Sequence, residues 1–300
     1  GDLDFLAQMY PIADRLLRYF DKYRRPDGLL EQVTDKWNLV DWPKAFRDNY
    51  DFDLTQPIGP GCHNVINAFY FGAQLAVNEI RDILGLPERE DVNGFRKAFQ
   101  NSFYNKETRL FVDAEGSEHS ALHSNALPLL FDLVPYEAKS SVVNLIREKR
   151  LACGVYMSYF VLKALASAGE YKLVYDLITS NDLHSWATMV NEGATSCYEA
   201  WSKDLKWNTS LCHPWSASPI PILIEEIIGL KPNKPGWEEV RFQPHIPENL
   251  EFLKLKIRVA AGEIQVEHRN GKTSLILPEG VELAKTRIMN DECLLEYRSS

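Results

Sequence analysis

The spacing of hydrophobic residues changes once along this 300-residue chain, and that change constrains the fold more than any other feature. Up to about residue 230, hydrophobic residues recur every three to four positions, as in Phe5, Met9 and Ile12, which is typical of amphipathic helices. After Pro232 they alternate with polar residues, which is typical of half-exposed strands. We therefore expect a helical domain at 1–230 and a small β domain at 231–300.

The periodic segments before residue 230 predict a succession of helices separated by turns that contain Gly, Pro or Asn. These helices are expected at 2–24, 62–84, 91–104, 118–133, 136–149, 152–168, 170–179, 182–190 and 219–228. Two mainly α architectures fit this order: a bundle or solenoid, and a closed toroid of helical hairpins. The lack of a fixed internal repeat disfavours a simple solenoid. In a toroid, the loops 37–51 and 193–215 would meet at one end.

The β domain is expected to be antiparallel. Its predicted strands are 240–242, 252–259, 263–267 and 273–277. Gly-containing turns lie between them, and Asn270-Gly271 is a strong hairpin signal.

Composition excludes several classes of function. The formal charge of −9 argues against a nucleic-acid partner, because such partners require clustered Lys and Arg. No apolar run reaches the ~18 residues of a membrane span. The five cysteines include no C-x-x-C pair, which argues against a disulfide framework or a zinc site. Nucleotide-binding glycine motifs are missing, so no cofactor is expected. Unpaired cysteines and the lack of a visible signal peptide favour the cytoplasm, and the periplasm remains an alternative.

The stretch 193–219 concentrates residues that suit a sugar pocket. Glu199 lies between Tyr198 and Trp201, an apolar setting that tends to raise the pKa of a carboxyl group and suits acid–base chemistry. Flat aromatic rings beside a carboxylate are typical of sugar sites, because they stack on the C–H face of the ring. An ordinary solvated Glu on a short helix fits the same local sequence.

Other candidate residues also have two interpretations. Asp41-Trp42 fits a pocket loop or a turn beside a core Trp, and 47–51 fits a surface ion-pair cluster. His119 and His123 lie four positions apart, as on one helix face, but no third metal ligand follows at a matching spacing, so no metal is expected. His123 can still line a pocket. His213 is either a packed turn residue or a pocket residue.

Taken together, the motifs resemble the bacterial α-L-rhamnosidases of glycoside hydrolase family 78, and the resemblance covers nearly the whole chain. Looser matches are Tyr10-Pro11, Asp27-Gly28-Leu29, Asp41-Trp42 and His123-Ser-Asn-Ala-Leu. The specific match is Gly193-Ala-Thr with Glu199-Ala-Trp201, followed by Ser210-Leu-Cys-His213-Pro-Trp.

The resemblance implies an (α/α)6 six-hairpin toroid followed by a β-sandwich, and hydrolysis of terminal α-L-rhamnosides with inversion. It implies that Glu199 is the general base, that His213 contacts the sugar, and that the Asp41-Trp42 loop lines the site. The expected partner is thus a carbohydrate. The full set of predicted substrate-binding residues is Asp41, Trp42, Trp37, His123, Trp201 and His213.

The chain departs from the family most clearly in its general acid. The family's general acid lies in an Asp- and Arg-rich segment before the first helix seen here, and nothing of that kind precedes Gly1. We therefore expect a toroid that is incomplete on its N-terminal side, with the acid supplied from upstream. A six-hairpin glycosidase with a different sugar specificity and a non-catalytic carbohydrate-binding relative are the alternatives.

Overall fold

The structure is a computed structural model that describes residues 1–35, 39–43, 46–50, 61–284 and 293–297. Its internal contacts divide it into two compact units, Asp2–Ala217 and Ser218–Ser300.

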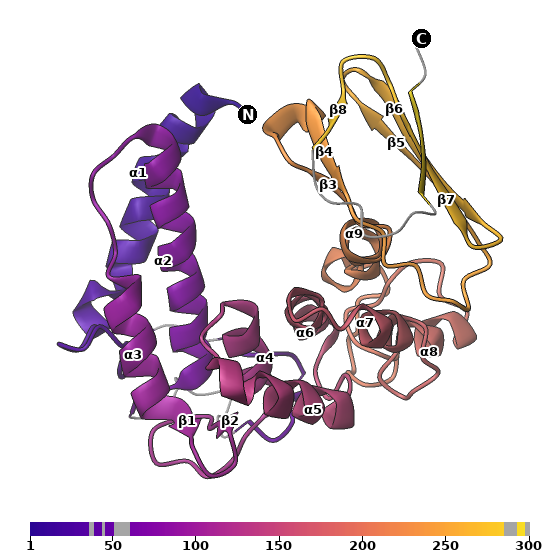
Figure 1. The fold of residues 1–300 in the computed structure, drawn as a ribbon. Coiled ribbons are helices and arrows are strands. Elements are labelled where there is room, and N and C mark those ends of the chain that lie inside the picture. Colours follow the sequence, from indigo (N-terminus) through magenta and orange to yellow (C-terminus); the bar gives the residue numbers. More distant parts are fainter. Residues whose placement is uncertain (36–38, 44–45, 51–60, 285–292, 298–300) are drawn as a thin grey trace. The chain divides into compact units, whose positions relative to one another are not determined.

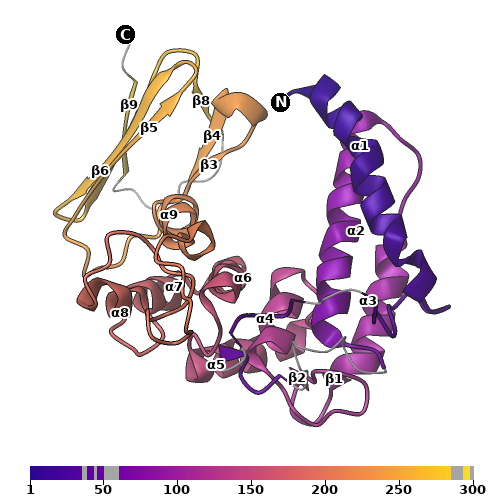
Figure 2. The same cartoon turned by 180° about the vertical axis from the view of Figure 1, so that it is seen from behind.

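The unit Asp2–Ala217 consists mainly of helices, and α2 packs against both α1 and α3 (Figures 1 and 2). Every helix expected before residue 191 is confirmed, and its ends shift by up to four residues when the 3-10 turns that adjoin the helices are counted. The α-helices are α1 (Leu3–Arg18), α2 (Asn64–Leu84), α3 (Val92–Phe103), α4 (Leu122–Leu130), α5 (Lys139–Lys149), α6 (Val155–Ser167), α7 (Tyr171–Ile178) and α8 (Trp186–Asn191). The 3-10 turns are η1 (Tyr19–Tyr23), η3 (Tyr136–Ala138) and η4 (Pro214–Ser216). The sequence pattern missed one short hairpin, β1 (Tyr104–Asn105) with β2 (Leu110–Phe111).

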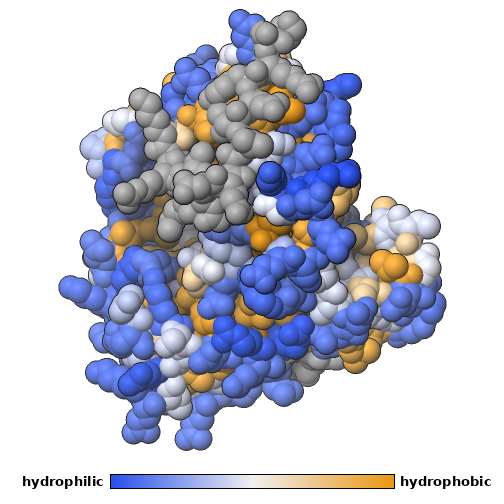
Figure 3. Space-filling model, turned by 45° about the vertical axis from the view of Figure 1, so that its right-hand side comes forward, coloured by the Kyte–Doolittle hydropathy of each residue, from blue (hydrophilic) through white to orange (hydrophobic). Residues whose placement is uncertain are grey.

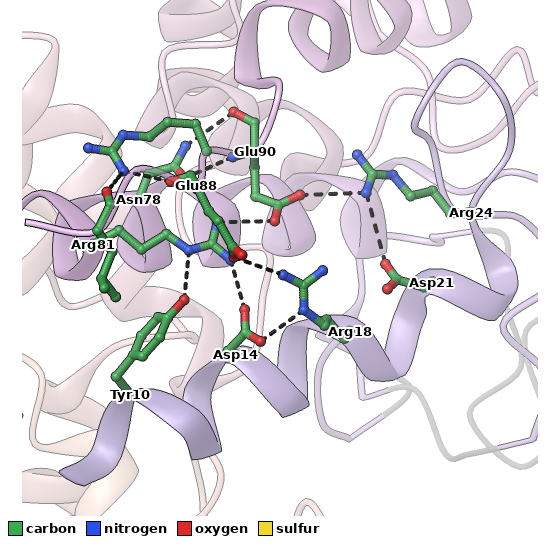
Figure 4. A network of polar contacts seen from close by, with 11 residues as sticks. Tyr10, Asp14, Arg18, Asp21, Arg24, Asn78, Arg81, Glu88 and Glu90 are labelled. Carbon is green, nitrogen blue, oxygen red and sulfur yellow. Dashed lines mark hydrogen bonds and ion pairs between the residues drawn. The ribbon is translucent and has the colours of Figure 1, made fainter. Parts of the chain in front are cut away.

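A polar network joins α1 to α2 and to the connection that follows α2 (Figure 4). At its centre is the buried guanidinium of Arg81. This group contacts Asp14 Oδ1 at 2.7 Å and Glu90 Oε1 at 3.2 Å, and its Nε donates to Tyr10 Oη at 3.1 Å. A buried cation without such partners would be strongly destabilising. The network therefore specifies how the two helices pair.

The apolar stripe of α1 is only partly buried. Leu17 is buried, whereas the side chains of Phe5 and Leu16 are exposed. Beside Leu16, an apolar cavity of about 460 Å³ lies between α1 and α2 and is lined by residues such as Phe69 and Ile80. On the face drawn in Figure 3, hydrophobic side chains emerge as separate patches among hydrophilic ones. Helical spacing thus predicted this helix but not how much of it is covered.

The core of this unit is built around α4 and α6, which pack against each other. Of the nine residues of α4, eight are buried. The N-terminus of α4 is satisfied by carboxylates: Ala121 N donates to Asp113 Oδ1 at 2.9 Å, and Leu122 N donates to Asp48 Oδ2 at 2.6 Å. Carboxylates are stabilised there because the first N–H groups of a helix have no partner within the helix.

These contacts correct the surface interpretation of residues 47–51. Arg47 and Tyr50 are buried, and Asp48 accepts hydrogen bonds from Leu122 N and from Lys149 Nζ, both at 2.6 Å. Asp51 lies outside the described residues. Asp48 and Tyr50 contact helix ends, which local sequence does not reveal.

The second unit begins with α9 (Pro219–Ile222) and a π-helical turn, η5 (Leu223–Ile227). Its strands form two sheets, ordered β3-β4-β8 and β5-β6-β7-β9. The strand bounds are β3 (Leu230–Pro232), β4 (Glu239–Phe242), β5 (Phe252–Val259), β6 (Gly262–Arg269), β7 (Lys272–Leu277), β8 (Glu282–Leu283) and β9 (Cys293–Tyr297). A single hydrophobic core contains Val240 and Phe242 from one sheet and Val266 and Leu275 from the other.

The four strands predicted from period two are all present. The Asn270-Gly271 turn joins β6 to β7, and both residues have the positive φ that this turn type requires. Each sheet also has one parallel pair, β4 with β8 and β7 with β9, which the local alternation did not indicate. Pairing between distant strands is decided by tertiary packing.

The contact division falls between Ala217 and Ser218, whereas the change of periodicity lies near residue 230. The difference arises because α9 and η5 are helical yet pack with the strands; η5 contacts β3. Across the described residues, no helix is both long and apolar enough to cross a membrane.

Candidate active site

Glu199 lies in an irregular loop between α8 and η4, not on the short helix of the alternative interpretation. Two backbone hydrogen bonds fold this loop back on itself, from Glu199 N to Ser210 O at 2.9 Å and from His213 N to Cys197 O at 2.8 Å. Trp215 Nε1 donates to Glu199 O at 3.2 Å. These bonds fix the backbone that carries the carboxylate.

Among the described residues, two groups donate to the Glu199 carboxylate, both to Oε2. Lys206 Nζ donates to Oε2 at 2.7 Å, and Ser210 N donates to the same atom at 3.0 Å. The Glu199 and Lys206 side chains are only 14% and 12% exposed. An ion pair this shielded from water is stronger than a surface pair.

The pKa of Glu199 is lowered, which corrects the expectation of a raised value. Burial alone would raise the pKa of this carboxyl group, but hydrogen bonds from Lys206 and Ser210 N, together with the nearby charges of Lys206 and His213, outweigh it. The aromatic neighbours predicted the desolvation, but Lys206, Ser210 N and His213 together reverse its effect on the pKa.

Asp41 is buried beneath the loop that carries Trp42. Its Oδ2 accepts from Gly154 N at 2.6 Å and lies 2.7 Å from His123 Nε2, while its Oδ1 accepts from Trp42 N at 2.8 Å. Gly154 is the N-cap of α6, and His123 is in the first turn of α4. Asp41 thus fixes the Trp42 backbone to the N-terminal ends of two core helices.

Gly154 permits this close approach. A Cβ atom added there would lie 2.3 Å from Trp42 O and 2.5 Å from Asp41 Oδ1. No residue larger than glycine fits without moving the loop.

Lys206 brings the two loops together. Its Nζ lies 5.7 Å from the centre of the Trp42 ring and 2.7 Å from Glu199 Oε2. The toroid model expected 37–51 and 193–215 to meet, and this contact joins residues from both segments. Trp37, also predicted to bind substrate, lies outside the described residues.

Trp201 and His213 occupy different environments. Trp201 is buried, donates from Nε1 to Cys153 O at 2.6 Å, and packs edge-on against Trp186. His213 is half-buried, and its ring centre lies 4.6 Å from that of Trp215. His213 and Trp215 therefore present ring surface near Glu199, whereas Trp201 supports the loop from the core.

Each histidine of the pair on 119–123 has its own carboxylate. His119 Nδ1 lies 2.6 Å from Asp113 Oδ2, and His123 Nε2 pairs with Asp41. His123 is fully buried. In the part of the chain that is described, no three His, Cys, Asp or Glu side chains gather as metal ligands.

Sequence reasoning missed Lys206 and Gly154. Lys206 lies only three residues after Lys203 in the same loop, and nothing in the sequence separates the two lysines. Gly154 precedes an apolar helix and resembles any other glycine before a helix. Only the fold shows that Gly154 contacts Asp41 and that Lys206 contacts both Trp42 and Glu199.

Comparison with known proteins identifies both units. Residues 1–227 match the bacterial alpha-L-rhamnosidase 6 hairpin glycosidase domain, and residues 229–282 match the bacterial alpha-L-rhamnosidase C-terminal domain. An alpha-L-rhamnosidase of Alteromonas sp. (strain LOR) is 23% identical over 286 residues, which cover 89% of this chain. One from Formosa agariphila is 19% identical over 307 residues, which cover 92% of it. The chain spans 30% of the length of each of these two relatives.

Solved structures show the same fold. The GH78 family rhamnosidase of Bacillus sp. GL1 superposes with a TM-score of 0.77 at 22% identity, over 100% of this chain and 33% of that one. The Streptomyces avermitilis alpha-L-rhamnosidase complexed with L-rhamnose gives 0.69 at 20% identity, over 91% and 26%. These similarities confirm a six-hairpin glycosidase domain followed by a small β domain. Because the two family models match nearly all of residues 1–282, the chain belongs to the bacterial α-L-rhamnosidase family.

Proposed function

We propose that this chain carries the water-activating side of an inverting α-L-rhamnosidase site, with Glu199 as the general base. The observation that carries the proposal is the shielded carboxylate of Glu199, which has a lowered pKa beside Lys206. A general base must be ionised before it can take a proton from water. A Glu is ionised at neutral pH even at its ordinary pKa, and the lowered pKa of Glu199 keeps it ionised at more acidic pH as well.

The surrounding rings suit a sugar. Trp42, His213 and Trp215 are half-buried and so retain accessible ring surface. Such surfaces stack on the C–H faces of a pyranose. The relatives named above are alpha-L-rhamnosidases, and one solved structure holds L-rhamnose, which supports a terminal α-L-rhamnosyl group as the substrate.

The reaction requires two carboxyl groups. Glu199 removes a proton from water, the water oxygen bonds to the anomeric carbon, and the glycosidic C–O bond breaks on the opposite face of the sugar. A carboxylic acid about 6.5–9.5 Å from the base protonates the departing oxygen. We propose that this acid is supplied by a part of the protein outside these 300 residues, as the family resemblance implies.

The remaining predicted residues divide into two roles in this proposal. Trp42 and His213 contact the sugar. Asp41, His123 and Trp201 are buried and hold the loops that carry those contacts. The substrate-binding role of Trp37 stays a prediction.

The test is Glu199→Gln in the protein that carries this chain. We expect turnover of an aryl α-L-rhamnoside to fall by about 10²–10⁴-fold, the usual contribution of a general base, while L-rhamnose still binds. Glu192→Gln is the matched control, because Glu192 lies in the same region and accepts hydrogen bonds from Ser202 and Lys203 instead. Near-normal turnover by Glu199→Gln would refute the assignment.

A panel of aryl glycosides tests the sugar. Preferential hydrolysis of a different glycoside would identify a six-hairpin glycosidase of another specificity. Binding of L-rhamnose without hydrolysis of any glycoside in the panel would identify a carbohydrate-binding relative.

A further inference from the structure

We propose that Lys206 is a positioning residue that anchors Oε2 of Glu199, so that Oε1 is the atom that takes the proton from water. This proposal rests on the proposed role of Glu199 as the base. It assigns separate tasks to the two carboxylate oxygens and a function to a lysine that the sequence does not distinguish.

The two oxygens of Glu199 have different surroundings. Oε2 accepts from Lys206 Nζ at 2.7 Å and from Ser210 N at 3.0 Å. Within the described ranges of the chain, neither backbone nor side chain donates a hydrogen bond to Oε1. A carboxylate oxygen with two strong donors is a poorer proton acceptor than its neighbour, because both donors stabilise charge on it. Oε1 is therefore the better base.

Lys206 is itself held in place at both ends. Its carbonyl accepts from Thr209 Oγ1 at 2.8 Å and from Thr209 N at 3.3 Å, which closes the turn that follows it. Its ammonium lies 5.7 Å from the centre of the Trp42 ring, within the range of a cation–π contact. A lysine fixed by its backbone and its charged end can hold a carboxylate in one orientation.

Lys206 also controls when Glu199 is ionised. The charged groups that affect the pKa of Glu199 are Lys206 and His213, and Ser210 contributes a backbone N–H. Each favours the carboxylate. Without the Lys206 ammonium, the pKa of Glu199 rises, and the ionised base is lost at a higher pH. Removal of one of the two donors to Oε2 also lets the carboxylate turn.

The decisive variants are Lys206→Met, which keeps the length of the side chain without its charge, and Lys206→Arg, which keeps the charge. Lys203→Met is the matched control, since Lys203 is exposed in the same loop and pairs with Asp204. Each is measured in the protein that carries this chain, as kcat and KM for an aryl α-L-rhamnoside against pH.

We expect Lys206→Met to move the acid limb of kcat/KM to higher pH by about one unit, which lowers the rate on that limb about tenfold. KM should change little, because the ammonium is paired with Glu199 rather than aimed at the sugar. Lys206→Arg should keep the acid limb of kcat/KM close to its wild-type pH, and Lys203→Met should leave the pH profile unchanged.

A second measurement does not depend on turnover. Water-soluble carbodiimide with a small amine labels a carboxyl group in its protonated form, and peptide mass spectrometry gives the fraction labelled at Glu199. In the protein that carries this chain, the pH at which this labelling is half-complete should rise in Lys206→Met and not in Lys203→Met. Lys206→Gln serves as a second uncharged variant if the Met variant is less stable.

The outcomes separate the two proposals. If Glu199→Gln is inactive while both uncharged Lys206 variants keep the wild-type acid limb and labelling midpoint, the role of Lys206 is refuted and the base assignment stands. If Glu199→Gln is active, the proposed function fails. In that case a raised labelling midpoint would show only that Lys206 holds Glu199 ionised.

Discussion

Replacement of the buried Asp41 by asparagine is expected to destabilise the helical unit severely. Asparagine has nearly the same shape, so the change leaves no cavity and removes only the charge and one acceptor. In the wild type, the Asp41 carboxylate accepts hydrogen bonds from His123 Nε2, Gly154 N and Trp42 N, with donor–acceptor distances of 2.6–2.8 Å. In either orientation, the NH₂ group of the new amide side chain would face at least one of these donors.

The magnitude follows from the burial. Both Asp41 and His123 are fully buried, so no water replaces the lost partner. Breaking a buried charge-assisted pair costs about 3–5 kcal/mol, and each buried donor left unpaired costs about 1–3 kcal/mol. The cost of breaking the pair already includes part of the cost of the unpaired donors, so the two figures are not added. We expect a loss of about 3–5 kcal/mol in total. For a unit of this size, that is a fall in Tm of roughly 6–20 °C.

Urea unfolding followed by tryptophan fluorescence measures this loss. Six of the seven tryptophans precede residue 218, so the signal reports mainly on the helical unit. The control is Asp132→Asn, because Asp132 also has two cationic partners, Arg96 and Lys139, but its side chain is 68% exposed. Exposed pairs of this kind contribute about 0–1 kcal/mol. If Asp41→Asn costs no more than Asp132→Asn, the proposed anchoring of the Trp42 loop is wrong.

Two further predictions use the same assay. Trp201→Ala should cost about 3–5 kcal/mol because Trp201 is fully buried, whereas Trp207→Ala should change stability by less than about 0.5 kcal/mol because Trp207 is 94% exposed. Equal effects of the two substitutions would contradict this difference in burial. Gly154→Ala should destabilise by at least about 1 kcal/mol, since the new methyl group would overlap Trp42 O and the loop must move. A neutral Gly154→Ala variant would mean that Trp42 O lies farther from residue 154 than the structure places it.

The secondary structure could be predicted from the sequence because its determinants are local. The helical spacing at 62–84 and the glycine at 85 predicted both ends of α2 closely, and Gly85 has a φ of 68° at the C-cap. Alternation over 252–259 matched β5 residue for residue. Parallel pairing of β9 with β7 was not predictable in this way, since it depends on strands that are not adjacent in sequence.

The candidate site was predictable only in part. The Gly-Ala-Thr to Glu199 stretch and the Asp41-Trp42 pair stood out as motifs, but their environments did not. Trp201, next to Glu199 in the motif, is buried, whereas Trp215 presents ring surface. Residues two positions apart in an irregular loop have no fixed periodicity, so sequence cannot say which side chain faces the site.

The sequence by itself determined the order of helices and strands, the family, and the carboxylate most worth testing. The tertiary structure decided the chemistry of that carboxylate. Aromatic neighbours along the chain argue for a raised pKa of Glu199, and Lys206 lowers it through a contact of 2.7 Å. Coulomb energy depends on distance in space and on exclusion of water, and neither can be read from separation along the chain.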